Sequence, residues 1–414
     1  SFSAVTGVGL PTYTSLFDPA TNTAVEQPLY ANNHNMFCPG ITMQPDGTML
    51  VNGGIDSPKT SLYDYRTNTW STQAVMNVPR GYNSSVLLAD GTTFTVGGSW
   101  SGPVGGKLGE IWTSASGWRT LPGVPADPMT GTDPEGTYRA DNHMWLFSVA
   151  NNWVFQAGPS PQMNWIDTKG SGTVVGVGNR LDDGMSMNGT VVMYDINKIF
   201  KAGGAPAYYN APATANTYVI DLSAGPPTAP TVRKTASMAY PRAFPNGVVL
   251  PNGQIVVIGG QTTPLAFDDA GAILRPEIWD PVTETFTQLA PMQTPRTYHG
   301  TALLLPDGRV MSSGSGLCGD FCPANHLNIE ILTPPYLLTA GGAPATRPVI
   351  NSAPAQSTAG ATISVTTDSS IAAFSLVRMS STTHAVNTDQ RRIPLAFSNA
   401  GGNSWSLSIP SSSG

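Results

Sequence analysis

The stretch VVLPNGQIVVIGG, residues 248–260, decides the fold class of this chain. It consists of two short apolar runs joined by an Asn-Gly pair, which favours a tight β-hairpin. The same unit recurs as ITMQPDGTMLVNGG (41–54), VLLADGTTFTVGG (86–98) and ALLLPDGRVMSSG (302–314). Two weaker copies run from Asn152 to Gly158 and from Asn197 to Gly203. One hairpin unit repeated along a chain is typical of a propeller or a solenoid.

The spacing of the repeat favours a kelch-type β-propeller. The six turn positions are 47, 91, 152, 197, 253 and 308, and successive turns lie 44 to 61 residues apart, as expected for blades with variable loops. Residues 1–30 resemble outer strands with no turn unit before them, so we expect an incomplete first blade at the N-terminus. Six units and that blade predict seven blades within residues 1–332.

A second, smaller domain is expected after the propeller. The segment ILTPPYLLTAGGAPATRP (331–348) is rich in Pro and Gly and is typical of a linker. Residues 340–414 alternate apolar and polar positions, which predicts an immunoglobulin-like β-sandwich that is incomplete at Gly414. The fold class is therefore all-β.

Composition narrows the function. The net charge of −6 gives no basic surface for nucleic acid, and no apolar run reaches 18 residues, so neither a nucleic-acid partner nor a membrane is expected. Low charge with abundant Gly and Pro suits a secreted, extracellular protein, and we expect a monomer. An odd count of three cysteines leaves one to explain: Cys318 and Cys322 are close enough for a disulfide, and Cys38 is left over.

A fixed register places reactive side chains at one depth of the propeller. Equivalent positions of successive blades lie at equal depth around the axis. Counting nine residues back from each turn gives Cys38, Tyr82, His143, Asn188, Phe244 and His299. Asn188 and Phe244 are interpreted as packing residues. A thiol, a tyrosine and the pair Tyr298–His299 at one depth favour a functional site over packing.

Imidazole and phenolate ligands indicate a transition metal, with copper favoured, because zinc usually takes a third His, Cys or carboxylate. Side chains alternate along a strand, so Tyr298 and His299 can reach one metal only where a strand ends or bulges. A second imidazole is available at His384, in THAVNTDQRR (383–392), if a distal loop reaches back into the channel.

Several motifs resemble those of the galactose oxidase family of fungal copper-radical oxidases, from about residue 12 to the C-terminus. They are MFCPGI (36–41), RGY (80–82), GGSWSG (97–102), YHG.ALLLPDGRV (298–310) and THAVNTDQRRIPL (383–395). The resemblance implies that one copper ion is held by Tyr82, Tyr298, His299 and His384. It also implies a Cys38–Tyr82 thioether that carries a tyrosyl radical, a role for Tyr298 as base, and Trp100 covering the crosslinked ring.

The resemblance further implies a primary alcohol or carbohydrate substrate, with O2 reduced to H2O2. Its substrate-side residues are Trp100, Tyr138, Arg139, Tyr209 and Phe267. Tyr209 stands where galactose oxidase has a Gln, which shifts the expected preference toward bulkier galactosides or aryl alcohols. The cysteine loop reads CGDFC instead of the usual CGDC, so a Cys318–Cys322 bridge is expected with altered geometry.

Two other functions fit parts of the pattern. A non-catalytic kelch propeller that binds proteins would not need Cys38, Tyr82 and His384 together. The aldehyde-oxidising, glyoxal oxidase-like branch of the same family shares the metal ligands, and Trp100 with Arg139 favours the alcohol-oxidising branch over it.

Overall fold

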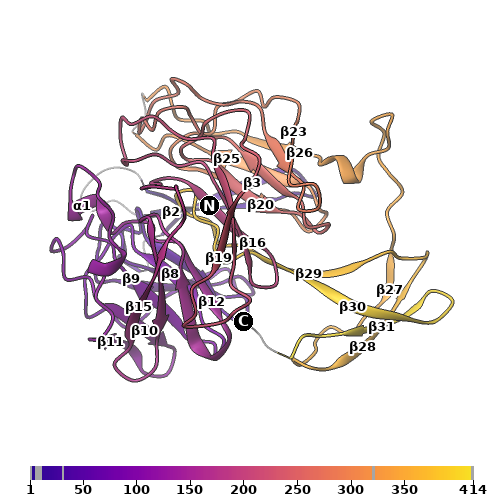
Figure 1. The fold of residues 1–414 in the computed structure, drawn as a ribbon, viewed down its shortest axis with the longest axis horizontal. Coiled ribbons are helices and arrows are strands. Elements are labelled where there is room, and N and C mark those ends of the chain that lie inside the picture. The colour runs from indigo at the N-terminus through magenta and orange to yellow at the C-terminus, as the bar shows by residue number, and fades with distance from the viewer. Residues whose placement is uncertain (1, 5–11, 30–31, 319–321, 412–414) are drawn as a thin grey trace.

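The computed structural model describes residues 2–4, 12–29, 32–318 and 322–411, which fold almost entirely as strands and loops (Figure 1). Five antiparallel sheets of four strands follow one another along the chain. Their strands are β4 (Gly40–Met43), β5 (Met49–Asn52), β6 (Thr60–Asp64), β7 (Thr69–Thr72); β8 (Ser84–Leu87), β9 (Thr93–Val96), β10 (Gly109–Thr113), β11 (Gly117–Leu121); β12 (Leu146–Val149), β13 (Trp153–Gln156), β14 (Gln162–Asp167), β15 (Thr173–Asn179); β16 (Thr190–Asp195), β17 (Lys198–Ala202), β18 (Thr217–Asp221), β19 (Thr231–Lys234); and β20 (Asn246–Val249), β21 (Ile255–Ile258), β22 (Glu277–Trp279), β23 (Phe286–Gln288).

The prediction of seven blades is wrong, because the described residues form five four-stranded blades. The two sheets at the ends of this region have three strands each: β1 (Phe2–Ala4), β2 (Thr12–Asp18) and β3 (Thr23–Leu29), then β24 (Gly300–Leu304), β25 (Val310–Gly314) and β26 (Ile329–Leu332). After β26 the chain passes through Pro334 and Pro335 into a 3₁₀ turn, η3 (Pro335–Leu337). Proline lacks the N–H that another ladder would need, so no fourth strand continues there.

The hairpin units form as their turn residues require. Gly91 and Gly253 have φ angles of 85° and 91°, which glycine adopts without the steric penalty that a Cβ brings. Neighbouring sheets then pack through their first strands, with β4 against β8, β8 against β12, β16 against β20 and β20 against β24. These strands are well buried: all four residues of β12 and of β20 are buried. The packing sets the first strands of successive sheets side by side, with the loops that precede them at one end of the propeller.

Buried ion pairs tie the Pro-Arg segments to the sheets. The Arg80 Nη1 donates to the Gly97 carbonyl at 2.9 Å, and its Nη2 meets the Glu110 carboxylate at 2.8 Å. Arg242 repeats this pattern with the Gly259 carbonyl and the Glu277 carboxylate, both at 2.8 Å. All four charged side chains are fully buried. Each arginine therefore fixes the loop that enters the next inner strand.

Helical structure in the described residues is limited to single turns. These are α1 (Thr137–Ala140), η1 (Asp127–Met129), η2 (Ala150–Asn152) and η3. No helix of the described residues is long and apolar enough to cross a membrane.

The C-terminal strands form a separate β-structure, which Figure 1 shows in yellow and orange beside the propeller. They are β27 (Ile350–Ser352), β28 (Thr362–Thr367), β29 (Phe374–Arg378), β30 (Arg391–Gly401) and β31 (Ser404–Ser408), paired in the order β29-β30-β31-β28-β27. Val365, Leu395, Trp405 and Leu407 form its small core. A single parallel bridge, Met193↔Arg391, joins it to β16. The boundaries at 332 and 340 stay predictions.

Candidate metal centre

The six register positions share one backbone conformation. Their φ angles all lie in the left-handed region: Cys38 61°, Tyr82 59°, His143 52°, Asn188 59°, Phe244 60° and His299 66°. A residue with a Cβ pays of order 1–2 kcal/mol there, and such strain collects at functional sites. Backbone hydrogen bonds link neighbours, from Tyr82 N to Cys38 O at 2.9 Å and from His143 N to Tyr82 O at 3.0 Å. The repeat therefore presents one side chain per blade at the same depth.

Tyr298 and His299 both face the centre because the strand has not yet begun. β24 begins at Gly300, and the left-handed His299 removes the alternation that a strand would impose. The two rings stack with centroids 3.8 Å apart. The His299 Nδ1 donates to the Gly316 carbonyl at 2.6 Å, which leaves its Nε2 directed inward, 3.9 Å from the Cys38 Sγ.

His384 reaches the same point on a loop that is inserted between inner strands. The Gln390 side chain pairs with the backbone of Val249, accepting from its N–H at 3.0 Å and donating to its carbonyl at 3.1 Å. The Asn387 Nδ2 donates to the Gly247 carbonyl, and the Thr190 hydroxyl donates to the Ala385 carbonyl. These side chains replace the ladder bonds that an inserted loop lacks, so the loop is held rigidly against the propeller.

Five reactive groups converge as a result. One ligand atom each from Cys38, His299 and His384 lies within 4.8 Å of the other two. The Tyr82 and Tyr298 hydroxyls are in direct contact. The His384 ring lies 4.6 Å from the Tyr82 ring and 4.9 Å from the His299 ring.

Desolvation disfavours the charged form of each of these groups. Desolvation lowers the pKa of His299 to about 4 and that of His384 well below its ordinary value. It raises the pKa of Cys38, Tyr82 and Tyr298 well above their ordinary values. Neutral imidazoles are the form that binds a metal, and a cation placed among the phenols would favour their ionised forms.

The residues fit a single transition-metal ion. The His384 Nδ1 pairs with the Thr383 hydroxyl at 2.7 Å, while its Nε2 is buried without a partner among the described residues. A buried ring nitrogen left unpaired costs free energy unless something binds it. Two imidazoles and two phenols form a nitrogen–oxygen donor set of the kind that copper(II) takes.

Known proteins resemble this chain over most of its length. The family "Glyoxal oxidase N-terminus" matches residues 209–336, and "Galactose oxidase-like, Early set domain" matches residues 347–414. A galactose oxidase of Gibberella zeae is 45% identical over 97% of this chain and 60% of its own length. The structure of a fungal alcohol oxidase of the AA5 family, in complex with copper, superposes with a TM-score of 0.93 at 41% identity, over 99% of this chain and 86% of that one. This chain belongs to the galactose oxidase family.

The likeness to the aldehyde oxidases is more local. An aldehyde oxidase of Arabidopsis thaliana is 36% identical over 115 residues, which are 26% of this chain and 19% of that protein. The chain spans 60% of the length of the galactose oxidases that it matches.

The structure brings most of the residues predicted for the substrate side to the candidate metal centre. The Trp100 ring lies 4.6 Å from the Tyr82 ring, tilted by 34°. The Phe267 ring lies 5.1 Å from the Tyr298 ring and is 39% exposed. The Arg139 guanidinium stands 4.3 Å over the Tyr208 ring, and its Nε pairs with the Glu135 carboxylate at 3.0 Å. The Arg139 Nη1 has no partner among the described residues.

Tyr138 and Tyr209 lie farther toward solvent than these. Tyr138 is 36% exposed and contacts the Arg139 guanidinium through its ring. Tyr209 is 51% exposed and directly follows the buried Tyr208.

Sequence reasoning missed Tyr208, which is buried beside the ligands. Its hydroxyl lies 3.3 Å from the Tyr298 hydroxyl and 3.5 Å from the His143 Nε2. The Asp133 carboxylate accepts the Tyr208 N–H and fixes this turn. The available signal was its position, because Tyr208 immediately precedes Tyr209 in the sequence.

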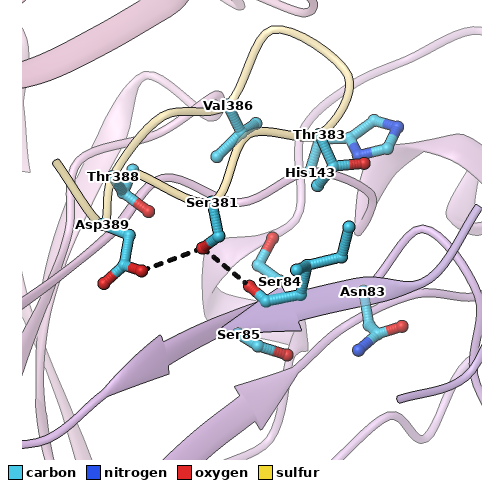
Figure 2. Close-up of a pocket in the computed structure, with 10 residues that line it drawn as sticks. Asn83, Ser84, Ser85, His143, Ser381, Thr383, Val386, Thr388 and Asp389 are labelled. Atoms are coloured by element: carbon cyan, nitrogen blue, oxygen red, sulfur yellow. Dashed lines mark hydrogen bonds between the residues drawn. The ribbon is translucent and has the colours of Figure 1, made fainter. Parts of the chain in front are cut away.

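His143 is placed as a neighbour of the ligands. Its ring stacks on the His384 ring at 4.5 Å, and burial lowers its pKa to about 3. Beside it lies a cavity of about 20 Å³, room for about one water molecule. Figure 2 shows Ser381, Thr383 and Asp389 of the His384 loop facing Ser84 and Ser85 across this cavity.

Two of the three cysteines are bonded to each other and the third is a free thiol, as expected from their positions in the sequence. Cys318 and Cys322 form a disulfide, and Cys38 is a free, buried thiol in the same apolar cluster as Tyr82.

Proposed function

We propose that this chain is a copper-dependent oxidase that converts a primary alcohol into an aldehyde while O2 is reduced to H2O2. The observation that carries the proposal is the convergence of two imidazoles, two phenols and a thiol at one point. The AA5 alcohol oxidase that superposes on this chain was solved with copper, and it supports the choice of metal.

Tyr82, Tyr298, His299 and His384 would hold the copper ion. When bound, copper would take one of the two electrons removed from the alcohol, and the Cys38–Tyr82 radical would take the other. Cys38 and Tyr82 are neighbours in a buried cluster, which favours a thioether between the sulfur and the ring. Trp100 covers the Tyr82 ring and limits its contact with solvent.

Tyr298 is proposed to accept the alcohol proton. Its hydroxyl touches that of Tyr82 and accepts a hydrogen bond from that of Tyr208, which supports this role. A base has to lie within hydrogen-bonding reach of the proton that it removes.

The substrate side favours an alcohol that carries both hydroxyls and an apolar face. The unpaired Arg139 Nη1 can donate to a substrate hydroxyl, because Glu135 holds the guanidinium through its Nε instead. Trp100 and Phe267 offer ring surface to a sugar face or an aryl group, and Tyr138 with Tyr209 lines the rim. The proposed substrates are galactose-type C6 hydroxyls and aryl or alkyl alcohols. The protein is proposed to act as a secreted monomer.

A second candidate is oxidation of aldehydes. The match of residues 209–336 to the glyoxal oxidase family favours it, since this segment includes Phe267, Tyr298 and His299.

Turnover on a panel of substrates tests both. Copper-loaded protein would be given galactose, raffinose, benzyl alcohol, butanol and methylglyoxal, with H2O2 as the readout. We expect faster turnover on at least one alcohol than on methylglyoxal, and none from His299→Ala, which lacks one of the two imidazole ligands. Faster turnover on methylglyoxal supports the second candidate, and no H2O2 from any substrate contradicts both.

A further inference from the structure

The orientation of His299 depends on one carbonyl group. The His299 Nδ1 donates to the Gly316 carbonyl at 2.6 Å. A metal-binding histidine is usually oriented by the partner of its other ring nitrogen, and loss of that partner commonly costs 10–100-fold in metal affinity. Whatever fixes the position of the Gly316 carbonyl therefore affects the inward-facing Nε2.

This carbonyl belongs to a strained turn. Gly314, Ser315, Gly316 and Leu317 have φ angles of 77°, 103°, 80° and 63°, four left-handed residues in succession. Ser315 and Leu317 carry a Cβ, so each pays of order 1–3 kcal/mol for this conformation. Such a turn persists only where other contacts hold it.

Backbone bonds from the Gly316 N–H to the Tyr298 carbonyl and from the Ser315 N–H to the His299 carbonyl hold the first part of this turn, and the Asn325 side chain holds the rest. Its Oδ1 accepts the Leu317 N–H at 2.6 Å and the Cys318 N–H at 3.3 Å. The same oxygen packs so closely on Gly316 that a Cβ at that position would clash with it. The Asn325 N–H donates to the Cys322 carbonyl at 3.1 Å, and the Cys318–Cys322 disulfide ties the two ends of this short segment together.

We infer that Asn325 is a positioning residue for the metal centre: its side-chain oxygen holds the left-handed turn 314–317, and the turn's Gly316 carbonyl fixes the ring of His299. The inference rests on the proposed function, because it concerns affinity for the copper ion. Asn325 does not contact the ligands itself and acts through Leu317 and Gly316.

Copper affinity is the direct test, and it needs no turnover. Metal-free protein would be titrated with Cu(II) against a competing chelator under anaerobic conditions, so that no thioether forms during the measurement. We expect Asn325→Ala to weaken copper binding 10–100-fold. Asn325→Asp keeps the accepting oxygen and should bind within about threefold of the parent protein.

Asn252→Ala is the matched control. This residue has the same side chain, but it pairs with Gln254 at an exposed turn outside the segment 314–325. Its copper affinity should not change. Thermal melting of the metal-free proteins measures any general destabilisation caused by Asn325→Ala. Asn325→Asp should restore copper affinity whatever that melting temperature is, which separates the loss of the side-chain oxygen from a loss of stability.

The outcomes are distinct. If the parent protein does not bind copper, the proposed function fails. If the parent binds and Asn325→Ala binds as tightly, or if Asn325→Asp weakens binding as much as Asn325→Ala, the inference is overturned. Should Asn325→Ala not fold, Gly316→Ala decides, since its Cβ displaces the turn from Asn325: unchanged copper affinity in that variant overturns the inference.

Discussion

The Tyr208 hydroxyl lies 3.3 Å from the Tyr298 hydroxyl, in an orientation that donates a hydrogen bond to it. A donor stabilises the charged form of its acceptor, so Tyr208 would assist Tyr298 in its proposed ionised form. Tyr209, the next residue, is half exposed and provides a matched control on the same turn.

Tyr208→Phe should therefore lower kcat/KM for alcohols while leaving the fold intact. A hydrogen bond to a charged group contributes about 1.5–3 kcal/mol, or roughly 10–100-fold in kcat/KM. Steady-state H2O2 assays on copper-loaded protein would measure it. Tyr209→Phe should change kcat/KM less than threefold, and equal losses in the two variants would contradict the role given to Tyr208.

Cys38 is expected to become linked to Tyr82 when the protein meets copper and O2. The two residues share a buried cluster, and the Cys318–Cys322 disulfide leaves Cys38 as the free thiol. Denaturing mass spectrometry after copper and O2 should show the loss of two hydrogens, with Cys38 and Tyr82 in one crosslinked peptide. Cys38→Ser should show no such loss; an unchanged mass in the parent protein would disprove the link.

Removing one partner of a buried ion pair should strongly destabilise the propeller. Glu110 is fully buried, and its carboxylate accepts from Arg80 and from the Asn77 and Val78 backbone N–H groups. Glu110→Ala leaves the Arg80 charge uncompensated, and we expect a loss of about 3–5 kcal/mol in the free energy of unfolding.

The exposed Arg66–Asp64 pair serves as the comparison for that variant. Asp64→Ala should cost far less than Glu110→Ala, because water screens both charges. Chemical denaturation of the two variants would measure the difference. Similar losses in the two variants would mean that burial of the Glu110–Arg80 pair does not increase its contribution to the free energy of unfolding.

The sequence predicted the site better than it predicted the blade count. The register worked because every inner strand is entered through the same left-handed residue, so a fixed offset from the turn finds Cys38, Tyr82 and His299 at one depth. The blade count failed because three-stranded sheets stand at both ends of the propeller, and the hairpin repeat does not reveal how many outer strands follow it. Tyr208 lies on a turn held by Asp133, 75 residues away, which no local pattern indicates.

His34 should make the metal-free protein sensitive to acid. It is buried, with the Ser61 hydroxyl and the Gly53 carbonyl as ring partners, and desolvation lowers its pKa to about 4. A lowered pKa means that the unfolded chain binds the proton more readily, so stability is fully present above pH 6.5 and is lost as the pH falls toward 4.

That loss should amount to about 2–3 kcal/mol between pH 7.5 and pH 4.5, at 1.36 kcal/mol for each pKa unit. Urea unfolding of the parent protein and of His34→Gln at both pH values would measure it. The variant should lose that much less stability than the parent on acidification. An identical loss in the two proteins would show that His34 does not contribute.

Tyr209 should bias the enzyme against free galactose. By family resemblance it replaces a glutamine whose amide orients a sugar hydroxyl, and its side chain is half exposed to solvent. A lost hydrogen bond to a polar group costs about 1–3 kcal/mol, while ring stacking on an aromatic substrate contributes about 0.5–1.5 kcal/mol. Both effects favour aryl alcohols and galactosides with an aglycone over galactose.

Tyr209→Gln should therefore raise the ratio of kcat/KM for galactose to that for benzyl alcohol by roughly 10-fold or more. Tyr209→Phe keeps the ring and should leave the ratio near the parent value. If Tyr209→Gln also leaves it unchanged, the exposed ring does not reach the substrate, and selectivity has to come from Arg139, Trp100 and Phe267, which lie closer to the ligands.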